Sequence, residues 1–344
     1  MTDITIYDIA KEAGVSIATV SRVLTKKTCV SDEKRKIVEK IIKKHSYKPN
    51  AAARSLSSGT RIIGLMVADI RNLYYATLAI ECEKAAGEQG YTVIICNMLN
   101  DPVYEDDLLE KLYGQRAEAI IQIGRQTDLV ISDPSYVKHV KHVNRVIPFI
   151  TTGRLEGVDF FSVSTDHTKS MKLVMDYLNS LGHKEIALVG GYKAWRTTYE
   201  KWVEYVRLLK LYKLKHRKEF FQEGECTDTA AYACMERILK AKTLPSAVIA
   251  INDECALGII LAAQDHGLSV PGDLSVISFD NTYLARLIRP LLTTVDCNFP
   301  LLGKTLIDVA IQAAQRKNPL RETLLEPILV VRDSCSRPGK LLPC

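Results

Sequence analysis

Short runs rich in Val and Ile alternate with helical stretches from Arg61 onward, and this alternation constrains the fold more than any other feature. Continuous apolar runs are typical of strands in parallel sheets that helices cover on both faces. About a dozen such elements are more than a single sheet of ordinary size holds, so the sequence predicts two similar α/β subdomains. Ligands bind beyond the carboxyl ends of strands in open α/β sheets, so facing subdomains would form a binding cleft. The runs are RIIGLMVAD, YTVIICN, AIIQIG, VIPFIT, FFSVST, EIALVG, AVIAIND and LSVISFD.

The first 60 residues have an all-helical pattern instead. Apolar residues from Ile6 to Ala13 fall on one helix face, and Gly14 stands where a helix ends in a left-handed conformation. Ser16 suits the N-cap of a second helix, which has one buried stripe. Two short helices with a Gly-containing turn predict a helix-turn-helix, although an ordinary helical hairpin has the same pattern. The stripe consists of Val20, Val23 and Leu24, whereas Ile17, Ala18, Ser21 and Arg22 avoid it and can touch a partner.

A third helix is predicted over residues 32–45, with Ser31 before it and acidic residues in its first turn. Pro49 disfavours helix at the residue before it, and Asn50 can cap a short segment, AAARSLS, over residues 51–57. That segment is too short to be stable alone in water, and its large apolar residue Leu56 has no local partner. We therefore expect this hinge segment to fold only against something else.

The positive charge of the chain is concentrated at its N-terminal end. The net charge is +6, and residues 1–60 contain 12 Lys and Arg against 6 Asp and Glu, whereas the remaining residues contain 34 of each sign. This distribution is the electrostatic footprint of a protein that binds the phosphate backbone of DNA. A lysine-rich, solvated surface is the alternative that charge alone leaves open.

The nine cysteines form no C-x-x-C pair and no Cys/His cluster with zinc spacing, so we expect reduced thiols, a cytoplasmic protein and no metal or cofactor. No signal region or membrane-spanning run is visible in the sequence, so we expect no membrane partner. The motifs GxxxxGK[ST], GxSxG, HExxH and GxGxxG are missing as well, which argues against an enzyme.

Polar residues follow several predicted strands. Each one alone could be a loop cap or a solvated residue, but as a set they are better explained by contact with a polar ligand. Trp195 and Trp202 are expected to pack in the core, although Trp195 could touch a ligand. The strand-end residues are Asp69 to Tyr75, Gly124–Arg125, Gly153–Arg154, Asn252–Asp253 and Asp280–Asn281, with Arg196 beyond the strand that ends at Gly190.

Residues 5–56 resemble the DNA-binding headpiece of the lactose-repressor and galactose-repressor family of bacterial transcription regulators. The resemblance rests on TIYDIAKEAGVSIATVSRVL and on YKPNAAARSL at the family's spacing. The rest resembles the family's sensor, a periplasmic-binding-protein-like fold. The matching landmarks are Asp166, LGH at 181–183, ND at 252–253, VPGDLSVISFDN at 270–281 and PLLTTV at 290–295.

The resemblance implies an all-α helix-turn-helix headpiece with a hinge helix at residues 1–60, then an α/β sensor at 61–344 with two doubly wound parallel-sheet subdomains. It places the N-subdomain at about 61–160 plus 293–323, and the C-subdomain at about 161–292 plus 324–340. We also expect the tail after Asp333 to be loose.

The resemblance also implies which headpiece residues contact DNA. Ser16, Thr19 and Ser21 would contact phosphates, and Arg22 has two donors that match guanine in the major groove. Leu56 would insert as a wedge into the minor groove at the operator centre. The full implied set is Thr5, Tyr7, Ser16, Ile17, Ala18, Thr19, Ser21, Arg22, Asn50, Ala53, Arg54 and Leu56.

In the sensor, the resemblance implies that the effector is bound by Tyr74, Tyr75, Arg196, Asn252, Asp280 and Phe299. The family's ligand-stacking tryptophan is replaced near Cys226, and Ile123 or Gly124 stands where a polar residue can occur. These residues favour a sugar or sugar derivative but do not choose among sugars, and purines remain open.

The sequence therefore predicts a homodimeric repressor that binds pseudo-palindromic operator DNA under the control of a small effector. A solute-binding protein or an enzyme on the same doubly wound fold is the rival interpretation, because a fold alone does not fix a function. The sequence leaves open the effector, the operator, whether the effector induces or co-represses, and any assembly beyond a dimer.

Overall fold

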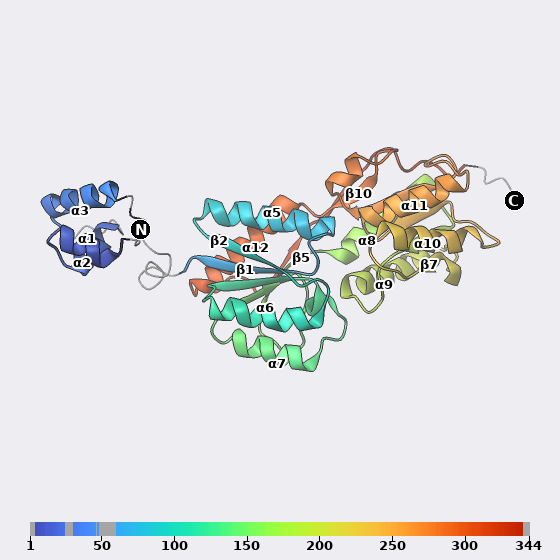
Figure 1. Cartoon of the computed structure of the whole chain (residues 1–344). Coiled ribbons are helices and arrows are strands. Elements are labelled where there is room, and N and C mark those ends of the chain that lie inside the picture. Colours follow the sequence, from blue (N-terminus) through green and yellow to red (C-terminus); the bar gives the residue numbers. More distant parts are fainter. Residues whose placement is uncertain (1–3, 25–29, 46, 48–59, 340–344) are drawn as a thin grey trace. The chain divides into compact units, whose positions relative to one another are not determined.

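The computed structural model describes residues 4–24, 30–45, 47 and 60–339 (Figure 1). The chain divides into two compact units, residues 1–61 and residues 62–344. We describe each unit by itself, first the headpiece and then the sensor.

The headpiece contains the helices α1 (Ile6–Glu12), α2 (Ile17–Leu24) and α3 (Asp32–Lys44). Thr5 and Asp8 form a capping box at the start of α1, and Gly14 has a φ of +60° directly after that helix. The Gly14 conformation is the left-handed turn that the sequence predicts between α1 and α2. The buried residues of this small core are Ile9, Ala10, Val20, Val23, Val38 and Ile41.

The N-subdomain of the sensor is an all-parallel sheet with strand order β11-β5-β4-β3-β1-β2. Helices α5 (Leu73–Glu88) and α12 (Phe299–Ala314) cover one face, and α6 (Pro102–Gly114) and α7 (Pro134–Val143) cover the other (Figure 1). The strands are β1 (Ile62–Val67), β2 (Thr92–Asn97), β3 (Ala119–Ile123), β4 (Phe149–Thr151), β5 (Phe161–Thr165) and β11 (Glu322–Leu325), and the short helix η1 (Arg125–Asp128) follows β3.

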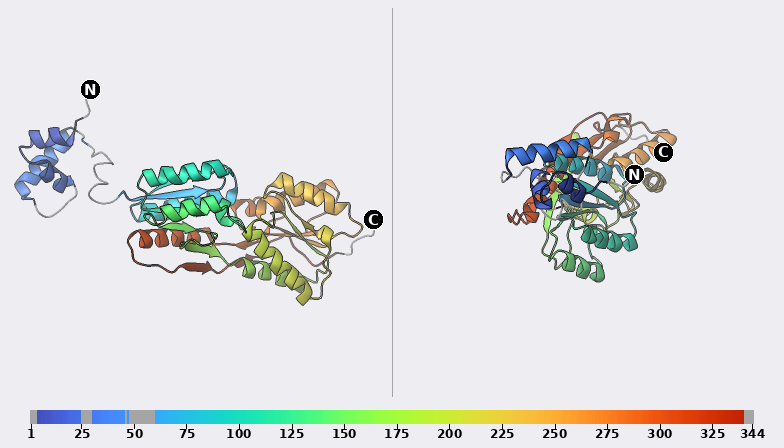
Figure 2. Two further views of the ribbon diagram at one scale, coloured as in Figure 1. Left: turned by 90° about the horizontal axis from the view of Figure 1, so that it is seen from below. Right: turned by 60° about the vertical axis from the view of Figure 1, so that its left-hand side comes forward.

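The C-subdomain repeats this arrangement of a sheet between helices (Figure 2). Its strand order is β12-β10-β9-β8-β6-β7, parallel except for the antiparallel pair β10–β12. Helices α10 (Asp228–Leu239) and α11 (Asp253–Asp265) cover one face, and α8 (His167–Leu181) and α9 (Arg196–Leu211) cover the other. The strands are β6 (Ile186–Val189), β7 (Phe221–Gln222), β8 (Ala247–Ala250), β9 (Ser275–Asp280), β10 (Thr293–Asp296) and β12 (Ile328–Val330), with short helices η2 (Lys218–Phe220) and η3 (Tyr283–Arg286).

The chain crosses between the two sheets three times, after β5, after β10 and after β11. Two crossings lie a few residues from the boundaries expected at about 160 and 293. Strand β5 (Phe161–Thr165) pairs with β4 and so belongs to the N-subdomain, whereas β10 (Thr293–Asp296) pairs with β9 and belongs to the C-subdomain. Each boundary shifts because a strand stays with the sheet whose hydrogen bonds it completes.

The expectation of a loose tail after Asp333 is wrong for its first residues. Ser334 is fully buried, and its hydroxyl donates to Val276 O at 2.6 Å and accepts from Thr293 N at 2.8 Å. Ser336 accepts a hydrogen bond at its carbonyl from the imidazole of His183 at 2.9 Å. The first residues of the tail are therefore hydrogen-bonded to β9 and β10 of the second sheet.

Within the described part of the chain, no helix has the length and apolar character needed to cross a membrane.

Candidate functional site

A cavity of about 680 Å³ lies between the two sensor subdomains, beyond the carboxyl ends of their strands. The strand-end prediction is reproduced here, because residues after β1, β3, β8 and β9 line this one space. Four of the six predicted effector residues lie in its wall, namely Tyr74, Tyr75, Asn252 and Asp280. Their placement is that expected of a ligand site in an open α/β sheet, and their contact with an effector remains a prediction.

The N-subdomain wall holds both of its arginines in ion pairs. Arg71 makes bidentate contacts with Asp69, at 3.0 and 2.5 Å from Nε and Nη2, and this guanidinium lowers the pKa of the buried Asp69 carboxyl. Arg125 lies 3.6 Å from Glu105, whose side chain is fully buried on α6. Ion pairs within one wall reduce the need for a ligand to neutralise it.

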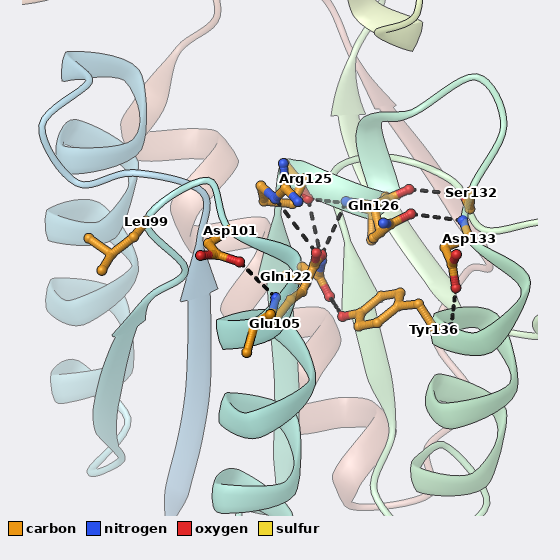
Figure 3. A network of polar contacts seen from close by, with 12 residues as sticks. Leu99, Asp101, Glu105, Gln122, Arg125, Gln126, Ser132, Asp133 and Tyr136 are labelled. Atoms are coloured by element: carbon orange, nitrogen blue, oxygen red, sulfur yellow. Dashed lines mark hydrogen bonds and ion pairs between the residues drawn. The ribbon is translucent and has the colours of Figure 1, made fainter.

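Glu105 is the centre of a polar network that supports η1 from behind (Figure 3). Its carboxylate accepts from the backbone N of Gln126 at 3.1 Å and from Gln122 Nε2 at 2.5 Å. The hydroxyl of Tyr136 on α7 donates to the side-chain carbonyl of Gln122, and Gln126 Oε1 accepts from Asp133 N at 2.8 Å. Burial raises the pKa of Glu105 to about 7. The network fixes the turn that carries Asp128 and Leu129 into the cavity wall.

The C-subdomain wall contains two opposite charges that do not pair with described residues. Lys201 of α9 is 6% exposed, and its ammonium lies 4.3 Å from the centre of the Phe279 ring, with no carboxylate of the described chain within ion-pair distance. Asp280 ends β9 with a φ of +102°, and burial raises its pKa to about 7. Lysine is almost never buried without a partner, so a ligand is the natural acceptor for this ammonium.

A second buried carboxylate nearby, Asp253, has a structural role instead. It accepts from Ser278 Oγ at 2.5 Å, from Thr294 Oγ1 at 2.9 Å, and from the N and Oγ1 of Thr282 at 2.7 and 2.9 Å. Asp253 does not line the cavity, whereas Asn252 beside it does, and caps α11 by accepting from Cys255 N at 2.8 Å. The Asn252–Asp253 pair thus divides into one cavity residue and one that joins β9, β10 and α11.

Two of the predicted effector residues lie outside the main cavity. Phe299 is 5% exposed and packs edge-on against Tyr74, with ring centres 5.4 Å apart, so it supports a cavity residue from behind. Arg196 donates from Nη2 to the carbonyls of Leu129 and Val130, at 3.4 and 3.2 Å, and lines a smaller neighbouring cavity. Trp195 does line the main cavity, which was the less favoured alternative for that residue.

Sequence reasoning missed Lys201, Asp128 and His167, all of which line the cavity. For Lys201, the only available signal was helical spacing, which places it on one face of α9 with Thr197 and Thr198. Burial lowers the pKa of His167 to about 3, so this imidazole is neutral. No group of three or more His, Cys, Asp and Glu in the described ranges could hold a metal ion.

In the headpiece, the predicted DNA contacts gather at the start of α1 and along α2. Tyr7 and Ile17 are 68% and 41% exposed, and Ala18 and Arg22 are exposed as well. The hydroxyls of Ser16 and Thr19 lie 2.9 Å apart, and Ser16 Oγ accepts from Thr19 N at 3.2 Å, as an N-cap does. Thr5 lies in the α1 capping box, and Ser21 is partly exposed. The hinge residues Asn50, Ala53, Arg54 and Leu56 lie outside the described residues.

Comparison with known proteins yields matches over both units. Residues 5–50 match the family described as "Bacterial regulatory proteins, lacI family", and residues 175–335 match the family described as "Periplasmic binding protein-like domain". Catabolite control protein A of Staphylococcus xylosus is 36% identical over 293 residues, which cover 85% of this chain and 87% of that protein.

Two solved structures are also similar. The Lac repressor dimer bound to operator and the anti-inducer ONPF has a TM-score of 0.87 at 25% identity, covering 97% of this chain and 100% of that chain. A LacI family regulator from Enterococcus faecium with bound ribose has a TM-score of 0.70 at 26% identity, covering 80% and 99%. With its helix-turn-helix unit, its two-sheet sensor and these relatives, this chain belongs to the lacI family of bacterial transcription regulators.

Proposed function

We propose that the protein is a repressor that binds pseudo-palindromic operator DNA as a homodimer and is controlled by a carbohydrate in the inter-subdomain cavity. It acts in the cytoplasm, where operator DNA is accessible. The observation that carries this proposal is the combination of a headpiece that holds the entire charge excess with a polar cavity between the two sensor subdomains. A regulator accounts for both parts, whereas an enzyme or a solute-binding protein leaves the headpiece without a role.

The headpiece is suited to the major groove. Helix α2 packs its apolar stripe inward and leaves Ile17, Ala18 and Arg22 exposed on the other side. An arginine reads guanine through two parallel hydrogen bonds, and small apolar side chains contact a thymine methyl. The hinge residues, including Leu56, stay a prediction from the sequence for contacts in the minor groove.

Replacing Arg22 tests base recognition. Arg22→Ala is expected to weaken binding to a selected operator by about 1–3 kcal/mol and to flatten its discrimination against scrambled DNA. Fluorescence anisotropy with both duplexes measures this, and Arg145→Ala on the sensor is the matched control. Equal weakening on both duplexes would reduce Arg22 to a phosphate contact.

An exposed apolar edge of the N-subdomain supports the homodimer. Strand β2 is the last strand of its sheet, and apolar side chains lie exposed on it and on the segments beside it. Contiguous apolar surface of this kind marks interfaces between proteins. Sedimentation of Leu99→Lys checks it, with a monomer as the expected result. The exposed residues are Ile80, Ile95, Leu99, Val103 and Tyr104.

The chemistry of the cavity favours a neutral polyhydroxylated ligand. A sugar hydroxyl can accept from Lys201 and donate to Asp280 at once, which a purely anionic or cationic group cannot do. The walls also present many hydroxyls, and a family structure similar to this chain contains ribose. A thermal-shift screen with sugars tests the class, because a true ligand stabilises the folded state by mass action. Stabilisation by sugar phosphates or purines alone would contradict it.

A further inference from the structure

The two subdomains touch each other at two separate places beside the cavity. Val130 N of the N-subdomain donates to Ala194 O of the C-subdomain at 2.8 Å. Leu73 N, at the start of α5, donates to Glu254 Oε1 of α11 at 2.9 Å. The cavity has its volume of about 680 Å³ with these contacts formed, and this volume lies in the range of cavities that bind ligands larger than a single sugar ring.

A second cavity of about 200 Å³ adjoins the first and extends it toward the strand β11. We call this smaller space the annex. It is lined on one side by Arg154, Arg196 and Glu322, which do not reach the main cavity. Because the two spaces share several wall residues, a ligand can occupy both. The shared residues are Asp128, Thr152, Ser164, Thr165, His167 and Thr197.

Two buried polar atoms at the annex have no hydrogen-bond partner among the described residues. Thr165 is 7% exposed, and its hydroxyl is unpaired although it borders both spaces. The Nε atom of Arg196 is buried and unpaired too, while its Nη2 is used by backbone carbonyls. Buried polar groups nearly always have partners, so unpaired ones in a cavity wall call for polar atoms from a ligand.

The annex is lined by two arginines and four carboxyl groups, and this excess of carboxyls selects the kind of group that fits. Arg154 pairs with Glu322 at 2.7 Å, and Asp166 accepts from Lys169 N at 2.8 Å as the N-cap of α8. The neutral His167 lies at the junction with the main cavity. A carboxylate or phosphate would meet Asp128, Glu200 and Glu322, and among the described annex residues only Arg196 would offer it a cation outside an ion pair. A neutral hydroxylated ring satisfies Thr165 and Arg196 without adding charge.

We propose that the effector is a disaccharide, with one ring between Lys201 and Asp280 in the main cavity and a second ring in the annex at Thr165 and Arg196. This proposal rests on the proposed function, since it assumes that the cavity takes a carbohydrate. It also gives Arg196 a way to contact the effector although that residue does not line the main cavity.

The test is a thermal-shift titration of the full chain with maltose, cellobiose, lactose, trehalose and sucrose, against glucose, galactose and fructose. At least one disaccharide is expected to stabilise the chain at concentrations tenfold or more below those its component sugars require. Thr165→Val removes only the hydroxyl and should weaken that disaccharide roughly two- to tenfold, the loss of one hydrogen bond. Thr229→Val on the exposed first turn of α10 is the matched control and should leave the titration unchanged.

Each outcome of the titration either supports the disaccharide proposal or contradicts it. If a monosaccharide stabilises the chain as well as any disaccharide and Thr165→Val responds like the parent, the annex is not part of the site, and the proposed carbohydrate control still stands. If no sugar of either size stabilises a chain that binds operator DNA, both the disaccharide and the carbohydrate class are overturned. Loss of the disaccharide response in Thr165→Val, with circular dichroism and unfolding temperature unchanged, supports the proposal.

Discussion

The two walls of the inter-subdomain cavity treat their charges differently. On the N-subdomain side, Arg71 pairs with Asp69 and Arg125 lies beside Glu105. On the C-subdomain side, Lys201 and Asp280 line the same space without pairing with each other or with another described residue. The paired arginines of the N-subdomain wall need less from a ligand, whereas Lys201 and Asp280 are left to be completed by one. We infer that the C-subdomain binds the first ring of the effector, and that the N-subdomain supplies the opposite wall and the Thr165 hydroxyl for the second ring.

The largest expected effect on stability comes from removing the Glu105 carboxylate behind the N-subdomain wall. Glu105→Ala leaves Arg125, Gln122 and the backbone N of Gln126 without their shared acceptor. The free energy of unfolding should fall by about 3–5 kcal/mol, the usual cost of removing one partner of a buried charged cluster. Urea denaturation measures it, and Asp107→Ala on the exposed side of the same helix is the control. A loss no greater than that of the control would mean that η1 needs no support from α6.

The other wall should respond in the opposite direction. Lys201→Met keeps the length of the buried side chain and removes an ammonium that lacks an acceptor in the empty cavity. We expect the ligand-free protein to gain about 1–3 kcal/mol of unfolding free energy, because an unpaired buried charge is costly. The same variant should lose its response to the effector. A drop in stability would instead show that the buried ammonium of Lys201 is already stabilised, by the Phe279 ring and by the negative charges of Asp128 and Asp280.

A smaller effect is expected from pH. Burial raises the pKa of Asp128, Asp280 and Glu105 to about 7, above their ordinary values of 3.8, 3.8 and 4.5. The folded state therefore binds protons more tightly than the unfolded state. The resulting stability is complete below about pH 4 and is lost as pH rises through about 7.

Unfolding free energy measured without ligand between pH 5 and pH 8 should therefore decline. Asp280→Asn should decline less steeply, because one of the three carboxyls no longer titrates. Ligand hydroxyls that donate to Asp280 favour its charged form, so effector binding should release protons near pH 7. Calorimetry in buffers of different ionisation enthalpy detects this. A flat stability profile would show that these carboxyls stay charged in the fold.

The sequence predicted the strands β1 to β6, β8 and β9 and the polar strand ends, because both follow from short-range pattern and one topological rule. The strands β7, β10, β11 and β12 were not among the predicted runs. Runs such as RIIGLMVAD have no alternative to a buried strand, and the carboxyl ends of parallel strands meet at one edge. Helices α7, α10 and α12 were not anticipated, although α7 has an apolar stripe of Tyr136, Val140 and Val143 at helical spacing.

Cavity residues carried by helices were harder to predict. Lys201 stands in a helix with other Lys and Arg residues, so in the sequence it looks like part of a solvated face. Only the packing of α9 against the second sheet turns it inward, which is tertiary information. Arg196 and Phe299 were expected at the effector by resemblance, and the structure places one in the annex and the other behind Tyr74. The buried Ser334 was missed because a tail with Pro and Gly gives no sign of the hydrogen bonds that it makes with β9 and β10.

Coupling between the cavity and DNA is the central claim, and operator affinity measured with and without the stabilising sugar tests it most directly. The wild-type chain should change its operator affinity when the sugar is added, and operator should change sugar affinity by the same factor. Asp280→Ala should bind operator as tightly as wild type without sugar and show no change with it. An unchanged wild-type affinity, or a full response in Asp280→Ala, would contradict the claim that this cavity controls the headpiece.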